Sequence, residues 1–359
     1  MEISNFAIIL TDDCNFDCSY CRLPKHKTAM NRATLDTAIP FFIKHLAAEC
    51  DITFFGGEPI LEFALIRHTV DLFSRYSTDE HPVPNYSITT NGTLLTDEML
   101  SFLNAHSIAI LLSYDGEAHD DCRKQDTRAI VEKALRTIQR FPNIRLSTNS
   151  VFTPGTIHKL SASLIHIAQM GVATIEFSLD QLAPWSEEAL HTLEEELDKL
   201  VRYMASLGGN PVPFPEFRPS SGESQGIFAC GGGRHRMVIA PDSRIWGCTH
   251  FHSYFKVNPN EEEMATYGFG LLEDFIADFD AVYPPILEHN ASLRQDMFHC
   301  GDKFCFLCQR VDQCRICPVY AARATKSIGD IPPWMCRVAA IMQTAKANLA
   351  LQSTPLPKP

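Results

Sequence analysis

Short apolar runs alternate with amphipathic stretches along the first half of this chain, and this alternation constrains the fold more than any other sequence feature. The apolar runs that predict strands lie at residues 6–11, 52–55, 86–90, 108–113, 144–151 and 173–178. Helical periodicity fills the gaps at about 33–49, 60–77, 96–105, 125–140 and 156–170. This order predicts an α/β fold, with a parallel sheet of six strand–helix units that closes partway into a barrel. In such folds the chemistry lies in the loops that follow the strands.

The second half of the chain is organised differently. Residues 186–206 form a charged helical pattern that begins with Ser186 as a plausible N-cap, and residues 337–351 resume a helical pattern. Between them the periodicity fades and cysteines take over, which is typical of a region that metal holds together. We therefore expect four parts, which are a partial barrel at 1–206, a linker or irregular segment at 207–227, a small cysteine-rich domain at 228–345 and a tail at 346–359.

Composition excludes several classes of partner. The 359 residues suggest about two domains at ~150 residues each. The formal net charge of −12 argues against nucleic acid and against anionic lipid surfaces. Neither a signal peptide nor an apolar run of the ~20 residues that a membrane span needs is present. We expect a cytoplasmic protein that binds neither nucleic acid nor membranes.

The number of cysteines, 13, is high for such a chain, and clustered thiols in a reducing compartment indicate metal binding or catalysis more than disulfides. Cys50 and Cys122 stand alone and are expected to be ordinary buried thiols. Three cysteines lie near the N-terminus, and eight more could fill two four-cysteine sites. These eight are Cys230, Cys248, Cys300, Cys305, Cys308, Cys314, Cys317 and Cys336.

Cys14, Cys18 and Cys21 form a C-x3-C-x2-C run directly after the first predicted strand. Three thiolates on one loop can hold three irons of a cubane cluster and leave the fourth iron open, as a catalytic centre requires. The alternative is a zinc knuckle with His26 as its fourth ligand.

This run, with the aromatic Tyr20 before its third cysteine, resembles the cluster motif of the radical S-adenosylmethionine (SAM) superfamily. Gly56-Gly57-Glu58-Pro59 follows the second strand, where the family contacts the amino group of SAM. Glycines let backbone carbonyls approach closely, and a nearby carboxylate suits an ammonium group. Weaker similarities end the next three strands and imply cofactor or substrate contacts. They are Asn91 in Thr90-Asn91-Gly92, Ser113 and Asp115 in Ser113-Tyr114-Asp115-Gly116, and Asn149.

The resemblance implies the chemistry as well. A [4Fe-4S] cluster with an open iron binds SAM, one electron cleaves the C–S bond, and a 5′-deoxyadenosyl radical abstracts hydrogen from the substrate. The protein would exclude water and position the substrate.

The later cysteines include the spacing C-x2-C-x5-C-x2-C at 305, 308, 314 and 317. Taken alone, the spacing is compatible with two zinc sites, two iron–sulfur clusters or one of each, with zinc slightly favoured. The region also resembles the SPASM extension of radical SAM enzymes, which implies two auxiliary [4Fe-4S] clusters. By that analogy Cys305, Cys308, Cys314 and Cys336 hold the outer cluster. Cys230, Cys248 and Cys317 hold the inner one, with Cys300 as the best candidate for its fourth ligand.

Two departures from that family pattern are visible. Ser243 stands where the family has glycine, and the last spacing of the quartet is x2 instead of x3, which leaves the assignment of Cys317 open.

SPASM-type enzymes mostly modify peptides and proteins, so the resemblance implies an oxidoreductase or maturase that modifies or cross-links a side chain. Thr249 follows Cys248 where sulfatase-maturing members carry an aspartate base, which weakens that reading, whereas residues 248–258 resemble peptide maturases that install cross-links. The catalytic candidates are His250, His252 and Asp115. The alternatives are oxidation of a small alcohol, trimming of a tetrapyrrole side chain, or a non-catalytic zinc scaffold that binds a partner.

Partners follow from the same resemblance. Because the cluster motif begins at Cys14, we expect no N-terminal leader-peptide-binding domain. A precursor peptide would then be recognised by the core of the enzyme or through a separate leader-peptide-binding protein. A reductant such as flavodoxin or ferredoxin would supply the electron.

Overall fold

The structure is a computed structural model of the chain. It describes residues 2–21, 25–207, 213–217, 232–292, 298–311, 314 and 316–353, with the backbone alone at 290–292 and 351–353.

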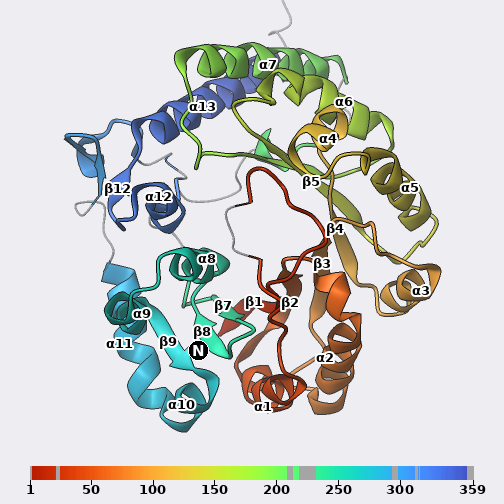
Figure 1. Ribbon diagram of the computed structural model, residues 1–359, viewed down its shortest axis with the longest axis vertical. Helices are drawn as coiled ribbons and strands as arrows, with labels where there is room; N and C mark the ends of the chain where they lie inside the picture. The colour runs from red at the N-terminus through yellow and green to blue at the C-terminus, as the bar shows by residue number, and fades with distance from the viewer. Residues whose placement is uncertain are drawn as a thin grey trace, which may run out of the picture.

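A curved parallel sheet with helices on its outer face forms the first half of the molecule (Figure 1). Its strands run in the order β6-β5-β4-β3-β2-β1, and each pairs in parallel with its neighbour in the sequence. The α/β fold expected from the alternation is therefore confirmed, with all six strands in place. They are β1 (Ile3–Thr11), β2 (Leu46–Gly56), β3 (Asn85–Thr90), β4 (Ala109–Ser113), β5 (Leu146–Phe152) and β6 (Ile175–Leu179).

The helices that cover this sheet lie close to their predicted ranges. Three begin with the side-chain cap that the sequence offers, since Asn31, Thr96 and Ser186 accept hydrogen bonds from the first-turn amides of Ala33, Met99 and Ala189. The helices are α1 (Arg32–Phe42), α2 (Phe63–Tyr76), α3 (Asp97–Ala105), α4 (His119–Cys122), α5 (Arg128–Ile138), α6 (Leu160–Gln169) and α7 (Glu187–Ser206). Short 3-10 turns are η1 (Ile43–His45), η2 (Pro59–Glu62), η3 (Gly116–Ala118) and η4 (Ile157–Lys159).

The predicted helix over 33–49 is wrong in its last part. Residues 46–49 contain good helix formers, yet they are the start of β2, and Leu46 is in register with Ile3 of β1. Pairing within the sheet overrides a weak local propensity here.

The nine-stranded sheet continues into the cysteine-rich half, because β7 (Arg236–Ile239) pairs in parallel with β1. Antiparallel β8 (Arg244–Trp246) and β9 (Gly268–Leu271) extend it. Ser243, at the β7–β8 turn, has φ +63°, a conformation that favours glycine, and its hydroxyl lies 2.9 Å from that of Thr34. This conformation accounts physically for the glycine of the family pattern at that position.

Regular structure is therefore more extensive after residue 228 than the fading periodicity indicated. The further elements are α8 (Thr249–Val257), α9 (Glu261–Tyr267), α10 (Leu272–Ala277), α11 (Phe279–Ser292), α12 (Pro318–Thr325), α13 (Pro333–Ser353) and η7 (Cys305–Leu307). A small second sheet joins β10 (His299–Cys300) to β11 (Lys303–Phe304) and β12 (Asp330–Ile331). In Figure 1, α13 lies beside α7, and the two helices are in contact.

The described part of the expected linker packs on the sheet. The N–H of Ile175 in β6 donates to the carbonyl of Pro213, and Phe217, in the turn η5 (Pro215–Phe217), stacks on Phe177. The expected boundary between 345 and 346 falls inside α13. The four-part division stays a prediction, and β7 joins the cysteine-rich part to the same sheet as β1. No helix among the described residues is both long and apolar enough to cross a membrane.

A shared apolar core joins the first half of the chain to the cysteine-rich half, and Phe275 of α10 lies in it. This fully buried ring contacts Phe41 and Phe42 of α1 as well as Phe269 of β9. We expect Phe275→Ala to lower the free energy of unfolding by about 3–5 kcal/mol in one cooperative transition. Leu271→Ala, a control at a 42% exposed position, should change it by about 0.5 kcal/mol or less. Denaturant unfolding of the metal-free chain measures both, and a separate early transition of the C-terminal half in Phe275→Ala would refute a shared core.

Candidate active site

The three N-terminal cysteines lie in the loop that leaves β1 at the carboxyl edge of the sheet. Thr11 shapes its start, since its hydroxyl donates to the carbonyl of Thr28 and accepts the N–H of Asp13. The Asp13 carboxylate accepts the N–H of Cys14 at 2.9 Å. Cys14, Cys18 and Cys21 are all half-buried.

The thiols interact with one another. Burial raises the pKa of Cys14 to about 11, with the charges of Glu58 and Cys18 adding to the effect, and burial also raises the pKa of Cys18 beside Cys21. The metal-free thiols of Cys14 and Cys18 resist deprotonation, so a compensating cation favours their thiolates. Iron of a cluster supplies that charge, and the loop fits such a group.

The Gly56-Gly57 segment after β2 packs directly on the loop after β1. The N–H of Gly57 donates to the carbonyl of Thr11, and the N–H of Glu58 donates to that of Asp13. A Cβ at Gly56, whose φ is +147°, would lie 2.4 Å from the Thr11 carbonyl oxygen, and one at Gly57 would lie 2.2 Å from that of Asp13. Only glycine permits this approach.

Binding of an ammonium group stays a prediction for Glu58, whose carboxylate has partners within the protein. This carboxylate is turned into the protein, with 1% of the residue exposed, and accepts hydrogen bonds from the Ile60 N–H, the Thr90 hydroxyl and the Asn91 N–H. Burial raises its pKa, although these donors act in the opposite direction. The carboxylate therefore joins the loop after β2 to the end of β3.

Asn91 links the loop after β3 to the cysteine loop. The side-chain Nδ2 of Asn91 donates to Oδ1 of Asn15 at 2.8 Å. Its Oδ1 accepts the backbone N–H and the hydroxyl of Thr93. Asn15 in turn donates to the Thr93 hydroxyl. Asn15 was not singled out from the sequence, although it lies inside the cysteine run.

The loop after β4 has its own buried ion pair. Asp115 is 0% exposed and binds the guanidinium of Arg123 through Nε at 2.7 Å and a terminal nitrogen at 2.9 Å, while also accepting the N–H of Val151. Arg123 lies over the ring of Tyr20 in the cysteine loop. The catalytic role of Asp115 stays a prediction, and in this structure its carboxylate is enclosed and paired with Arg123.

Two further predicted contacts lie next to each other. Ser113 at the end of β4 is in register with Asn149 of β5, so both residues are at the edge where the cysteine loop lies. Their roles as cofactor contacts stay predictions, as does that of Tyr20.

The predicted histidines are on α8 and differ in surroundings. His252 is buried, with Nε2 3.5 Å from Oδ1 of Asp12, and Lys256 Nζ lies 2.6 Å from Oδ2 of the same carboxylate. Burial raises the pKa of Asp12, but these two partners outweigh it and the net pKa is lowered. His250 packs against Tyr320, and its pKa is lowered to about 4 by burial and by Arg323 and Arg236.

Of the two predicted histidines, His252 is the one that contacts Asp12 at the start of the loop after β1. The Asp12–Lys256 pair was missed by the sequence reasoning, and its two residues are separated by most of the chain.

The later cysteines divide into two groups. Cys248 and Cys317 pack against one apolar cluster with Trp246 and Phe255, whereas another apolar cluster includes Cys300, Cys305, Cys314 and Cys336. The Sγ atoms of Cys300 and Cys336 are 2.9 Å apart. The assignment of Cys300 to the inner set stays a prediction, although Cys300 lies beside Cys336 here, and Cys230 lies outside the described residues.

Among the described residues, no three His, Cys, Asp or Glu side chains converge on a point as the ligands of a single metal ion would. All ligand sets stay predictions. Cys50 and Cys122 are buried, as expected.

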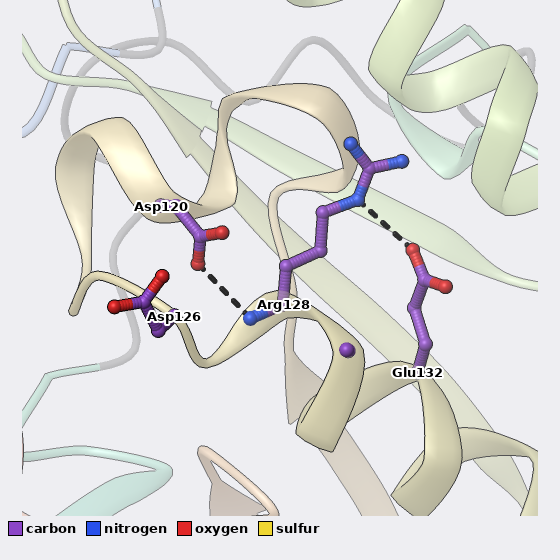
Figure 2. A pocket seen from close by; sticks show the side chains of 5 residues that line it. Asp120, Asp126, Arg128 and Glu132 are labelled. Atoms are coloured by element: carbon purple, nitrogen blue, oxygen red, sulfur yellow. Dashed lines mark hydrogen bonds and ion pairs between the residues drawn. The ribbon is translucent and has the colours of Figure 1, made fainter.

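A polar hollow of about 400 Å³ lies at the start of α5 and is bordered by Asp120 of α4 (Figure 2). Its charges satisfy each other, because Arg128 pairs with Glu132 and Glu117 and its N–H donates to Asp120. Asp126 and Ala129 complete the lining. Asp120 caps α5 at this hollow, since its carboxylate accepts the backbone N–H groups of Thr127 and Arg128.

Comparison with known proteins agrees with this geometry. Residues 8–160 match the model of the Radical SAM superfamily, so this part of the chain is a radical SAM domain. Such a domain implies SAM and a [4Fe-4S] cluster, and the Cys14, Cys18 and Cys21 loop fits that group.

Three similar proteins extend the comparison. The radical SAM cyclopropyl synthase TigE of Paramaledivibacter caminithermalis is 23% identical over 282 residues, which are 71% of this chain but only 59% of that protein. The structure of native anSMEcpe with bound AdoMet and Cp18Cys peptide covers 98% of each chain with a TM-score of 0.75 and 17% identity. Streptococcus suis SuiB bound to its precursor peptide SuiA covers 93% of this chain and 76% of its own, with a TM-score of 0.64 and 15% identity.

Gly57→Ala tests the contact between the two loops. The added Cβ must displace the Asp13 carbonyl, so we expect SAM binding by the reconstituted protein to weaken at least about tenfold, which is about 1.4 kcal/mol. Gly155→Ala is the control, because its Cβ meets only the Thr153 hydroxyl at an ordinary 3.7 Å. Equilibrium dialysis measures the affinity, and equal affinities for the two variants would contradict the loop contact.

His119 makes stability depend on pH. It is fully buried, its Nδ1 accepts the N–H of Asp115, and burial lowers its pKa to about 4. Below about pH 6.5 the unfolded chain binds a proton at His119, whereas the folded chain binds it only near pH 4. The free energy of unfolding therefore falls as the pH falls from about 6.5 to 4. We expect the metal-free wild type to lose about 2.5 kcal/mol more than His119→Asn between pH 7 and 4.5. Denaturant unfolding at both pH values measures this, and equal losses would show that His119 is not responsible.

Proposed function

We propose that this protein is a radical SAM enzyme that modifies a side chain of a peptide or protein substrate. The observation that carries the proposal is the packing of Gly56-Gly57 on Thr11 and Asp13, which lead into the Cys14–Cys21 loop at the edge where the strands of a radical SAM domain end. When bound there, SAM and a [4Fe-4S] cluster would supply a 5′-deoxyadenosyl radical that removes hydrogen from the substrate.

The residues of the chain have defined tasks in this proposal. Cys14, Cys18 and Cys21 would bind three irons, and the backbone carbonyls after β2 would receive the amino group of SAM, since the Glu58 carboxylate is already bonded. Tyr20, Asn91, Ser113 and Asn149 would border the remainder of SAM or the substrate. Asp115 and Arg123 would fix the loop after β4 against Tyr20 without touching the reaction.

His252 is our candidate for proton transfer. It lies beside Asp12, which immediately precedes the cysteine loop, and Lys256 holds that carboxylate from the other side. A histidine beside a carboxylate is suited to this role. His250 packs away against Tyr320, so we assign it a structural role between α8 and α12.

A peptide substrate is supported by the likeness in fold to two structures that contain peptides, anSMEcpe with Cp18Cys over 98% of that chain and SuiB with SuiA over 76% of that chain. We further propose auxiliary [4Fe-4S] clusters at the later cysteines and a one-electron donor such as flavodoxin or ferredoxin. A separate leader-peptide-binding protein is a candidate partner, and the thiol content suits a reducing cytoplasm.

The test is release of 5′-deoxyadenosine by anaerobically reconstituted protein given dithionite and SAM. We expect release from the wild type and from Cys50→Ala, whose thiol is buried in the core, and at least a 100-fold loss when Cys14, Cys18 and Cys21 are all replaced by Ala. Chromatography of the quenched mixture measures the nucleoside. Release that survives the triple replacement would refute the proposal.

A further inference from the structure

The hydroxyl of Tyr20 is buried in the cysteine loop and has no hydrogen-bond partner among the residues that the structure describes. A buried hydroxyl without a partner costs free energy, because it has lost the hydrogen bonds that it makes to water. Tyr20 stands between the second and third cysteines of this loop. The groups that lie near its hydroxyl are Arg123, Asp115 and the thiols of Cys18 and Cys122.

The end of α4 holds the cysteine loop, so the position of this hydroxyl is fixed. The N–H and the hydroxyl of Ser19 both donate to the carbonyl of Cys122, at 2.8 and 3.2 Å. The guanidinium of Arg123 lies 5.5 Å from the centre of the Tyr20 ring. Two hydrogen bonds to Asp115 fix this guanidinium in turn. The backbone next to Tyr20 and the ring of Tyr20 are thus both held by residues at the end of α4.

Three of the four neighbouring groups have no place for this hydroxyl. Arg123 offers only donors. The Asp115 carboxylate accepts two hydrogen bonds from Arg123, and it accepts two more from the Val151 N–H and the Cys122 thiol, which fills its four acceptor positions. The Cys122 thiol donates its proton to Asp115, and a protonated sulfur is a weak acceptor. The sulfur of Cys18 is the remaining acceptor, and it lies within reach of this hydroxyl.

We propose that the Tyr20 hydroxyl donates a hydrogen bond to the sulfur of Cys18 when this sulfur binds iron, and that the bond raises the reduction potential of the cluster. A thiolate on iron carries negative charge and accepts a hydrogen bond more strongly than a thiol does. Hydrogen bonds to the sulfurs help to set the potential of an iron–sulfur cluster. A donor stabilises the reduced state more, because that state carries one more negative charge. This inference rests on the proposed cluster, and Tyr20 acts in it through Cys18.

Tyr20→Phe removes the hydroxyl and keeps the ring, and Tyr86→Phe is the matched control. The hydroxyl of Tyr86 is also buried without a partner in the described part of the chain, but its ring packs on Phe54 and Phe73, four residues before β3 ends at Thr90. Since neither hydroxyl bonds to the described residues, we expect both variants to keep the denaturant midpoint of the metal-free wild type. A lower midpoint in Tyr20→Phe alone would overturn the inference, because the hydroxyl would then have a partner in the metal-free chain.

The reduction potential is read from a stepwise anaerobic reduction of the reconstituted full chain, followed by electron paramagnetic resonance. The signal of the cluster is the one that is absent when Cys14, Cys18 and Cys21 are all replaced by Ala. At a fixed potential we expect the ratio of reduced to oxidised cluster to fall at least about threefold in Tyr20→Phe, which is about 28 mV at ~59 mV per tenfold. Tyr86→Phe should keep the ratio of the wild type.

The proton of the hydrogen bond gives a second readout. In D₂O, electron–nuclear double resonance of the same signal should show an exchangeable deuteron coupling in the wild type and in Tyr86→Phe that Tyr20→Phe lacks. An unchanged ratio or an unchanged deuteron coupling in Tyr20→Phe would overturn the inference and leave the cluster in place. A wild type without any signal that depends on the three cysteines would instead refute the proposed function.

Discussion

The buried carboxylate of Glu58 is the interaction on which the arrangement of the site depends. Burying a charged group is costly unless it is hydrogen-bonded, and here three donors from two loops satisfy it. Hydrogen bonds to a charged group contribute about 1.5–3 kcal/mol each, so the carboxylate joins the loop after β2 firmly to the loop after β3. The backbone N–H of Glu58 also donates to the carbonyl of Asp13. This hydrogen bond connects the start of the cysteine loop to the same network.

The second half of the chain frames the cysteine loop from the other side. β1 pairs with β2 on one edge and with β7 on the other, so both halves of the molecule share the strand that leads into Cys14. α8 then brings His252 and Lys256 to Asp12, one residue after β1 ends. The second half of the chain therefore contacts both the strand that leads into the cysteine loop and Asp12, two residues before Cys14.

Much of this could be predicted from local pattern. Strands and helices repeat with clear periods, and Cys14 and Gly56 follow two strands whose carboxyl ends must meet at one edge of a parallel sheet. The direction in which each side chain points, and the residue that it pairs with, could not be predicted. Glu58 and Asp115 are carboxylates in motif-like loops, yet both turn inward to partners that only the fold identifies. The spacing of the cysteines likewise could not predict the neighbours of Cys300. The pairing of β10 with β12, and not the distance along the sequence, brings Cys300 to Cys336.

The central claim is that the Cys14, Cys18 and Cys21 loop holds a cluster whose open iron receives the amino group of SAM. Electron–nuclear double resonance of the reduced, reconstituted protein with SAM labelled by ¹⁵N at its amino group tests this directly. The account predicts a strong ¹⁵N coupling to the cluster that disappears when the three cysteines are replaced by Ala. A reduced cluster that survives this replacement, or one without ¹⁵N coupling when SAM is saturating, would contradict it.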